Sequence, residues 1–107
     1  MNMRFAENSI RLRVTGDEFA QLRIGKTMAL EVTLPQGHLF RAKLNMALTG
    51  DWDFNSDPTG MWISVPRKEI DALADELPSK EGIEHAFATQ KGELQVSLEV
   101  DVKRSAS

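Results

Sequence analysis

Four cationic side chains recur at alternating positions in two segments of the 107-residue chain. Arg11 and Arg13 alternate with apolar residues, and Arg41 and Lys43 do the same further along. In a strand, residues two positions apart share a face and lie about 7 Å from each other. Each segment would therefore present a pair of cations that could bind a phosphate, a carboxylate or an acidic peptide.

The predicted binding site combines these cations with neutral donors and an aromatic side chain. Its members are Asn8, Ser9, Arg11, Arg13, Arg41, Lys43 and Trp62. The ligand would be a protein partner or a small anion. The alternative is that the cations only pair across strands with Glu31, Glu99 and Asp101. Such exposed pairs stabilise a protein by only about 0.2–1 kcal/mol each.

One polar segment has part of the spacing of a calcium-binding loop. Asp51, Asp53 and Asn55 alternate as calcium ligands do, but Ser56 stands where the loop needs glycine. Trp62 stands where a bidentate glutamate should be. We therefore predict a solvated loop and no metal site.

Residues that could form a catalytic centre are not grouped in the sequence. His38 and His85 are far apart, and no serine lies in a nucleophile-elbow motif. The chain has no cysteine, which excludes disulfides, thiol nucleophiles and Cys-ligated metals. The pattern favours a protein that is not an enzyme, and it predicts no cofactor.

Three aromatic residues lie outside the strongest apolar patterns. Trp52 and Phe54 fall in the polar segment, and Trp62 should point away from the helices. Exposed aromatics favour an interface, such as a homodimer formed through the open sheet face. The alternative is that Trp52 and Phe54 fold back over one end of the core.

Charge and composition predict a soluble cytoplasmic protein. The net charge of −3 argues against general binding to nucleic acid. No apolar run is long enough to span a membrane, and the polar start is not a signal peptide. Residues 1–50 carry seven Lys and Arg against four Asp and Glu, whereas residues 51–107 carry six against twelve. This asymmetry would orient the molecule in a complex, or it is drift on a solvated surface.

The elements that position these residues follow from hydrophobic periodicity. Residues 9–14 alternate as a half-buried strand, and Thr15 with Glu18 has the spacing of a capping box. A helix is predicted from Gly16 to Ile24, followed by an antiparallel hairpin over residues 27–48.

A similar order follows in the second half of the chain. Residues 60–65 alternate as a strand, and the next apolar stripe predicts a helix that Pro78 ends. Strands are predicted over residues 82–89 and 94–102.

The layout strand–helix–strand–strand thus occurs twice in one predicted domain, residues 1–107. Leu12 and Phe19 match Ile63 and Ile70 at a constant spacing of 51 residues. The predicted repeats are residues 9–49 and 60–102, joined by a loop at residues 50–59. Independent amphipathic elements could produce the same match. The predicted class is α+β: one antiparallel sheet of six to seven strands with two helices on one face, which could curl into a half-barrel.

Arg4, residues 8–15 and the turn from Glu18 to Leu22 form a distinctive pattern at the start of the chain. In these residues the chain resembles a family of small bacterial proteins of unknown function. The resemblance implies that Asn8, Ser9, Arg11 and Arg13 distinguish such proteins, and it implies no activity. Two functions are predicted from the residues: a non-enzymatic interaction module that uses the basic sheet face, or a phosphate- or nucleotide-binding domain or small enzyme that acts on a phosphorylated substrate.

Overall fold

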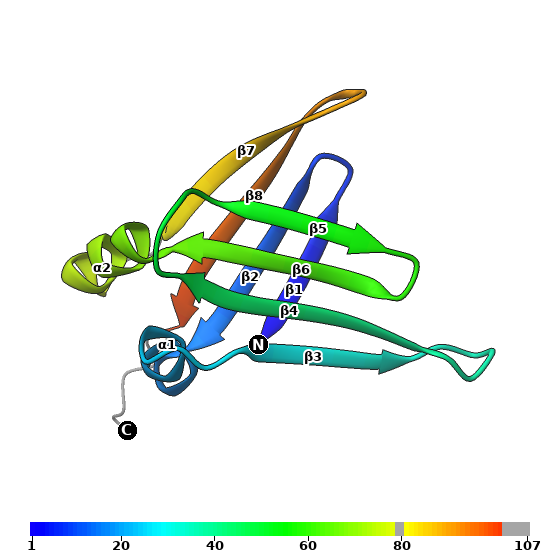
Figure 1. Cartoon of the computed structure of the whole chain (residues 1–107), viewed down its shortest axis with the longest axis horizontal. Coiled ribbons are helices and arrows are strands. Elements are labelled where there is room, and N and C mark those ends of the chain that lie inside the picture. Colours follow the sequence, from blue (N-terminus) through cyan, green and yellow to red (C-terminus); the bar gives the residue numbers. More distant parts are fainter. Residues whose placement is uncertain (79–80, 102–107) are drawn as a thin grey trace.

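The chain forms two four-stranded sheets and two helices, and the computed structural model describes residues 1–78 and 81–101. In chain order the elements are β1 (Asn2–Ala6), β2 (Ser9–Thr15), α1 (Gly16–Arg23), β3 (Met28–Thr33), β4 (Leu39–Ala47), β5 (Asp53–Asp57), β6 (Gly60–Pro66), α2 (Arg67–Glu76), β7 (Ile83–Thr89) and β8 (Gly92–Asp101). Sheet A has the order β1-β2-β8-β7, and sheet B has the order β3-β4-β6-β5 (Figure 1). The predicted α+β class and the two helices are confirmed.

The prediction of a single antiparallel sheet is wrong. Each sheet consists of two antiparallel hairpins joined by a central parallel pair, β2 with β8 and β4 with β6. The helices α1 and α2 carry the chain from one sheet to the other, so consecutive strands on either side of a helix are not neighbours. Alternation along a strand determines its buried face but not its neighbour. In the described part of the chain neither sheet closes into a barrel.

The predicted orientation of β2 is confirmed. Leu12 is 1% exposed and Val14 is buried with it, whereas Arg11 and Arg13 are exposed. The apolar side of the strand therefore faces the core, and the guanidinium groups face water.

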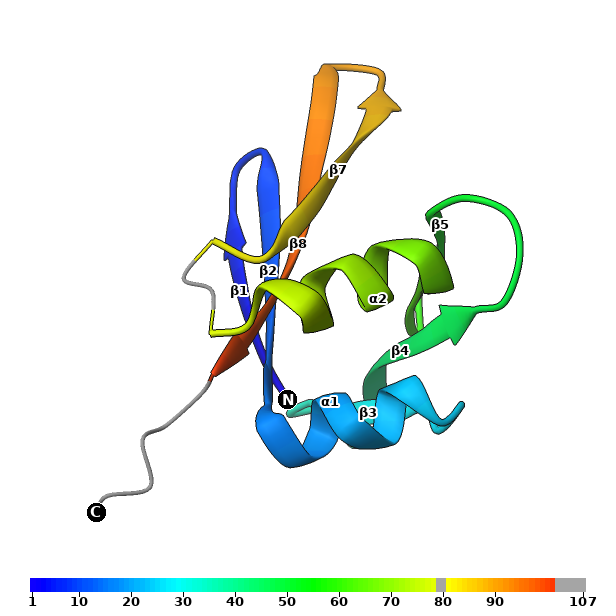
Figure 2. The same ribbon diagram turned by 90° about the vertical axis from the view of Figure 1, so that its left-hand side faces the viewer.

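Both helices lie on the core side of the sheets (Figure 2). Helix α1 contacts β2 and β8 of sheet A and β4 of sheet B, while α2 contacts β4 and β6. The two helices also contact each other. One core results, and its largest fully buried residues include Leu12, Leu22, Leu44, Ile63, Ile70, Leu73 and Leu98. No helix within residues 1–78 and 81–101 has the length and apolar character needed to cross a membrane.

The two halves of the chain have the same order of elements and equivalent strand register. The first half runs β1-β2-α1-β3-β4, and the second runs β5-β6-α2-β7-β8. Leu12 lies opposite Leu98, and its counterpart Ile63 lies opposite Leu44 in the same kind of parallel pair. The predicted repeats omitted β1 and β5, the first strand of each half. Position 102, the predicted end of the second repeat, lies outside the described residues.

The predicted loop at residues 50–59 contains a strand. β5 pairs with β6 along the edge of sheet B and exposes Asp53, Asn55 and Asp57 to water. Phe54 is the only residue of β5 that packs against the core. One apolar residue cannot produce the apolar–polar alternation from which a strand is predicted.

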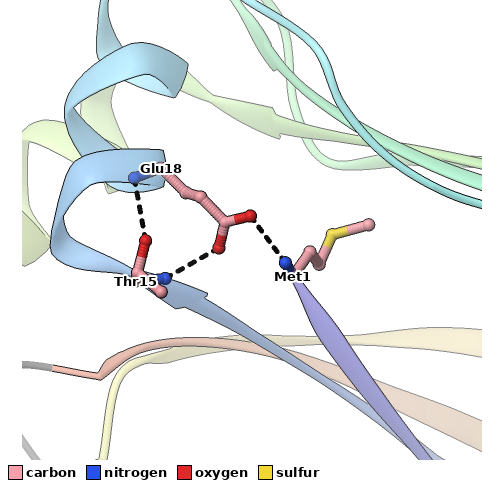
Figure 3. A network of polar contacts seen from close by, with 3 residues as sticks. All are labelled: Met1, Thr15 and Glu18. Carbon is pink, nitrogen blue, oxygen red and sulfur yellow. Dashed lines mark hydrogen bonds and ion pairs between the residues drawn. The ribbon is translucent and has the colours of Figure 1, made fainter.

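Helix α1 begins with the predicted capping box (Figure 3). The Glu18 amide donates to Thr15 Oγ1 at 3.1 Å, and the Thr15 amide donates to Glu18 Oε1 at 2.9 Å. The ammonium of Met1 donates to Glu18 Oε2 at 2.6 Å. These hydrogen bonds, above all the one from the ammonium, lower the pKa of Glu18 below its ordinary value of 4.5.

We expect Glu18→Gln to lower the free energy of unfolding at neutral pH by about 1 kcal/mol, because the amide loses the charge-assisted bond. A carboxyl whose pKa is lower in the folded state stabilises the protein above its unfolded pKa, here about 4.5. The difference between wild type and variant should shrink as the pH falls from that value through the lowered pKa. Urea unfolding between about pH 3 and pH 7 measures it.

Glu69→Gln provides the matched control on α2. That helix follows Pro66, whose side chain makes no capping hydrogen bond. A loss of the same size and pH dependence at Glu69, or a loss at Glu18 that does not change with pH, would contradict this account of the cap.

Candidate functional site

The polar outer side of sheet A carries two of the predicted cations, Arg11 and Arg13, among further charged residues. We call it the polar face of sheet A; it comprises Asn2, Arg4, Ser9, Arg11, Arg13, Glu84, Gln95, Ser97 and Glu99. Arg4 lies opposite Arg11, Arg11 opposite Ser97, and Ser97 opposite Glu84, so these four form one row across the sheet. Both helices lie on the other side (Figure 2).

Glu99 anchors the arginines of this face. The residue is 7% exposed, and its Oε2 accepts from Arg11 Nη2 at 2.7 Å and from Arg11 Nε at 3.1 Å. Arg13 Nη2 lies 3.5 Å from Glu99 Oε1. A buried carboxylate without partners would be costly, so Glu99 holds both guanidinium groups over β8. The guanidinium side chains are themselves half exposed and remain accessible to a ligand.

Charge is separated across this face. The cations Arg4, Arg11 and Arg13 lie on β1 and β2, whereas the acids Glu84 and Glu99 lie on β7 and β8. Within residues 1–78 and 81–101, neither Arg4 nor Glu84 forms an ion pair. The face is therefore bipolar, with a basic half and an acidic half.

A hollow of about 580 Å³ opens on this face. Its lining consists of Ser9, Arg11, Glu81, Gly82, Glu84, Gln95, Ser97 and Glu99. Carboxylates outnumber cations in this lining, so the hollow lies over the acidic half. A basic or hydrogen-bonding group fits it better than a free anion does.

The predicted site residues are divided between the two sheets. Ser9, Arg11 and Arg13 lie together on sheet A, and Asn8 lies in the turn before them, where its carbonyl accepts from the Gln95 amide at 3.0 Å. The other three, Arg41, Lys43 and Trp62, lie on sheet B. The seven predicted residues therefore do not share one sheet face, because β2 and β4 belong to different sheets.

On sheet B, the predicted cations have different surroundings. Arg41 Nε lies 2.7 Å from Glu31 Oε2, which is one of the cross-strand pairs considered as the alternative. Lys43 lies opposite Trp62 in the parallel pair of β4 and β6. Both line a hollow of about 360 Å³ together with His38, Leu39, Arg41 and Thr59.

Trp52 and Phe54 fold back onto the core. This is the second of the two arrangements that the sequence allowed, and it excludes these two residues from an exposed interface. Trp52 is 6% exposed and stacks on His85, with ring centroids 5.6 Å apart. Phe54 meets Phe87 edge to face at 5.7 Å. These contacts join β5 and its preceding residue to β7, and so they connect the edges of the two sheets.

Sequence reasoning missed Arg4 and Glu84 as members of the polar face. Arg4 lies in β1, a strand of only five residues before the predicted strand over residues 9–14. Nothing in the sequence indicated that β1 pairs with one side of β2. Nor did it indicate that β8, followed by β7, lies on the other side of β2.

The fold and the polar face define an α+β protein of two mixed four-stranded sheets with an exposed bipolar surface. Residues 1–104 match the model of a family of unknown function, DUF7009. The chain belongs to this family, so the expected membership of a family of unknown function is confirmed. No curated protein and no solved structure matches the chain.

Proposed function

We propose that this protein is a non-enzymatic interaction module that binds a protein partner through the polar face of sheet A. The observation that carries the proposal is the fixed arrangement of its charges: Arg4 and Glu84 lie on opposite edge strands, and the buried Glu99 holds Arg11 and Arg13 between them. A fixed pattern of both signs favours one orientation of a partner over others and speeds its encounter.

A free phosphorylated ligand fits this face less well. Arg11 and Arg13 are already bound to Glu99, and Glu84 lines the adjoining hollow and would repel a phosphate. A protein surface can place an acidic group on the arginines and a basic group in the hollow at the same time. We therefore favour the interaction module over a phosphate- or nucleotide-binding domain.

The test is a titration of the isotopically labelled chain, followed by amide chemical shifts. The probes are a short peptide with alternating Lys and Glu, an all-Glu peptide and inorganic phosphate. We expect the mixed peptide to perturb amides of β2 and β8 most strongly. Arg11→Gln with Arg13→Gln should weaken its binding at least about tenfold, since two charge-assisted contacts are lost.

Arg41→Gln with Lys43→Gln makes the same change of charge on sheet B and should leave the affinity unchanged. Circular dichroism establishes that each variant is folded; if the first pair unfolds the chain, Arg4→Gln replaces it. Perturbations confined to sheet B, or an affinity insensitive to the sheet A arginines, would reject this function. Stronger binding of phosphate than of the mixed peptide would favour the phosphate-binding domain instead.

A further inference from the structure

We infer that the partner of the polar face of sheet A is a second copy of this chain, related by a two-fold axis that runs parallel to the strands between β2 and β8. This inference rests on the proposed function and names the partner. Its basis is the arrangement of charges in rows across the sheet.

The rows make the face self-complementary. Neighbouring strands are evenly spaced, so β1 and β7 lie equally far from the line between β2 and β8. A half-turn about that line exchanges β1 with β7 and β2 with β8, while each residue keeps its row. Arg4 then faces Glu84 of the second copy, because both belong to the row that contains Arg11 and Ser97.

The next rows bring no like charges together. Arg13 lies opposite Glu99 in the parallel pair, so the axis places it over the row of Glu99 of the second copy, a buried carboxylate that already holds Arg11 and Arg13 of its own chain. Ser9 lies opposite Gln95, so these two polar side chains face each other between copies. Every contact occurs twice, as an isologous interface requires.

A two-fold axis that runs across the strands would also bring this face onto itself. It would leave β1 facing β1 and β2 facing β2, and so it would place the three arginines of one copy against those of the other. Like charges brought together at an interface are strongly unfavourable. The charge pattern therefore selects the axis parallel to the strands.

The shape of the face agrees with this choice. The hollow of about 580 Å³ lies over the acidic half, and the half that faces it in the second copy carries the long side chains of Arg4, Arg11 and Arg13. The basic half of each copy can thus enter the hollow of the other. Exposed ion pairs are individually weak and are screened by salt, so we expect a dimer that dissociates as salt is raised.

The test exchanges the charges of one row. Arg4→Glu and Glu84→Arg each place like charges together at two symmetric contacts, and each should weaken the dimer at least about tenfold. Both residues are exposed, so the variants should fold, which circular dichroism checks. Sedimentation equilibrium at low and high salt measures the association of each chain.

The decisive result comes from mixing the two variants. A heterodimer of the Arg4→Glu chain with the Glu84→Arg chain has opposite charges at both contacts, so two weakly associating chains should associate when combined. A single chain with both substitutions should regain the wild-type dimer. Native mass spectrometry with one chain isotopically labelled distinguishes the heterodimer. Lys43→Glu, on sheet B, is the control and should not alter association.

Three outcomes would overturn the inference: a wild-type chain that stays monomeric at low salt, a dimer insensitive to both single variants, or a mixture of them that does not associate. If the chain is monomeric but the mixed peptide still maps to β2 and β8, the interaction module stands and this partner is rejected. If the peptide also fails to bind that face, both proposals are rejected.

Discussion

Replacing Gly60 with alanine should lower the free energy of unfolding by roughly 3 kcal/mol, at the upper end for an overpacked site. Gly60 lies opposite Arg41 in the parallel pair of β6 and β4. A Cβ at Gly60 would lie 2.0 Å from the carbonyl oxygen of Arg41. Because this oxygen belongs to the backbone, β4 and β6 would have to separate. Urea unfolding measures the loss as a lower midpoint.

Gly16→Ala is the matched control, since it adds the same methyl group without a clash. Nothing lies within 4 Å of a Cβ at Gly16, which is the first residue of α1. Alanine there should be neutral or stabilising by up to about 1 kcal/mol, because it lowers the entropy of the unfolded chain. If both variants lost the same stability, the close approach of β6 to β4, and with it the order of sheet B, would be wrong.

The second large effect should come from Leu12, at the centre of sheet A. Leu12 is 1% exposed, and truncation to alanine leaves a cavity in the core that α1 and both sheets share. Substitutions of this kind cost about 2–5 kcal/mol. The neighbouring substitution Arg13→Ala should cost about 1 kcal/mol or less. Arg13 is half exposed, and its ion pair with Glu99 is long, at 3.5 Å, so it contributes little to stability.

This pair of variants tests the orientation of β2 directly. Both are truncations to alanine at adjacent positions of one strand, and their effects on urea unfolding should differ by several-fold. Equal losses at Leu12 and Arg13, or a larger loss at Arg13, would place the guanidinium side of the strand in the core. Arg11 and Arg13 would then be inaccessible to any partner.

The sequence was sufficient for features that depend on neighbours along the chain. The alternation around Leu12 predicted the buried side of β2, and Thr15 with Glu18 predicted the start of α1. Pro78 predicted the end of α2, whose last residue is Glu76. A period of two or of 3.6 residues is a local property, so it can be read without knowing which elements meet.

The candidate site was predictable only in part for the same reason. Arg11 and Arg13 lie two positions apart in one strand, so their common face followed from the alternation. Their separation from Arg41 did not, because it depends on α1 leading the chain from sheet A to sheet B. The acidic lining of the hollow could not be predicted either, because Glu84 lies more than 70 residues after Arg11 in the sequence.

The two helices, the buried side of the main strands and the exposure of the arginines of β2 follow from patterns along the chain. The parallel pairing of β2 with β8, the division of the strands into two sheets and the common row of Arg4 and Glu84 became known from the fold. The physical reason is that a strand offers the same backbone hydrogen bonds to any neighbour. Its partner is chosen by the packing of side chains distant in sequence, here the core that both halves of the chain build together.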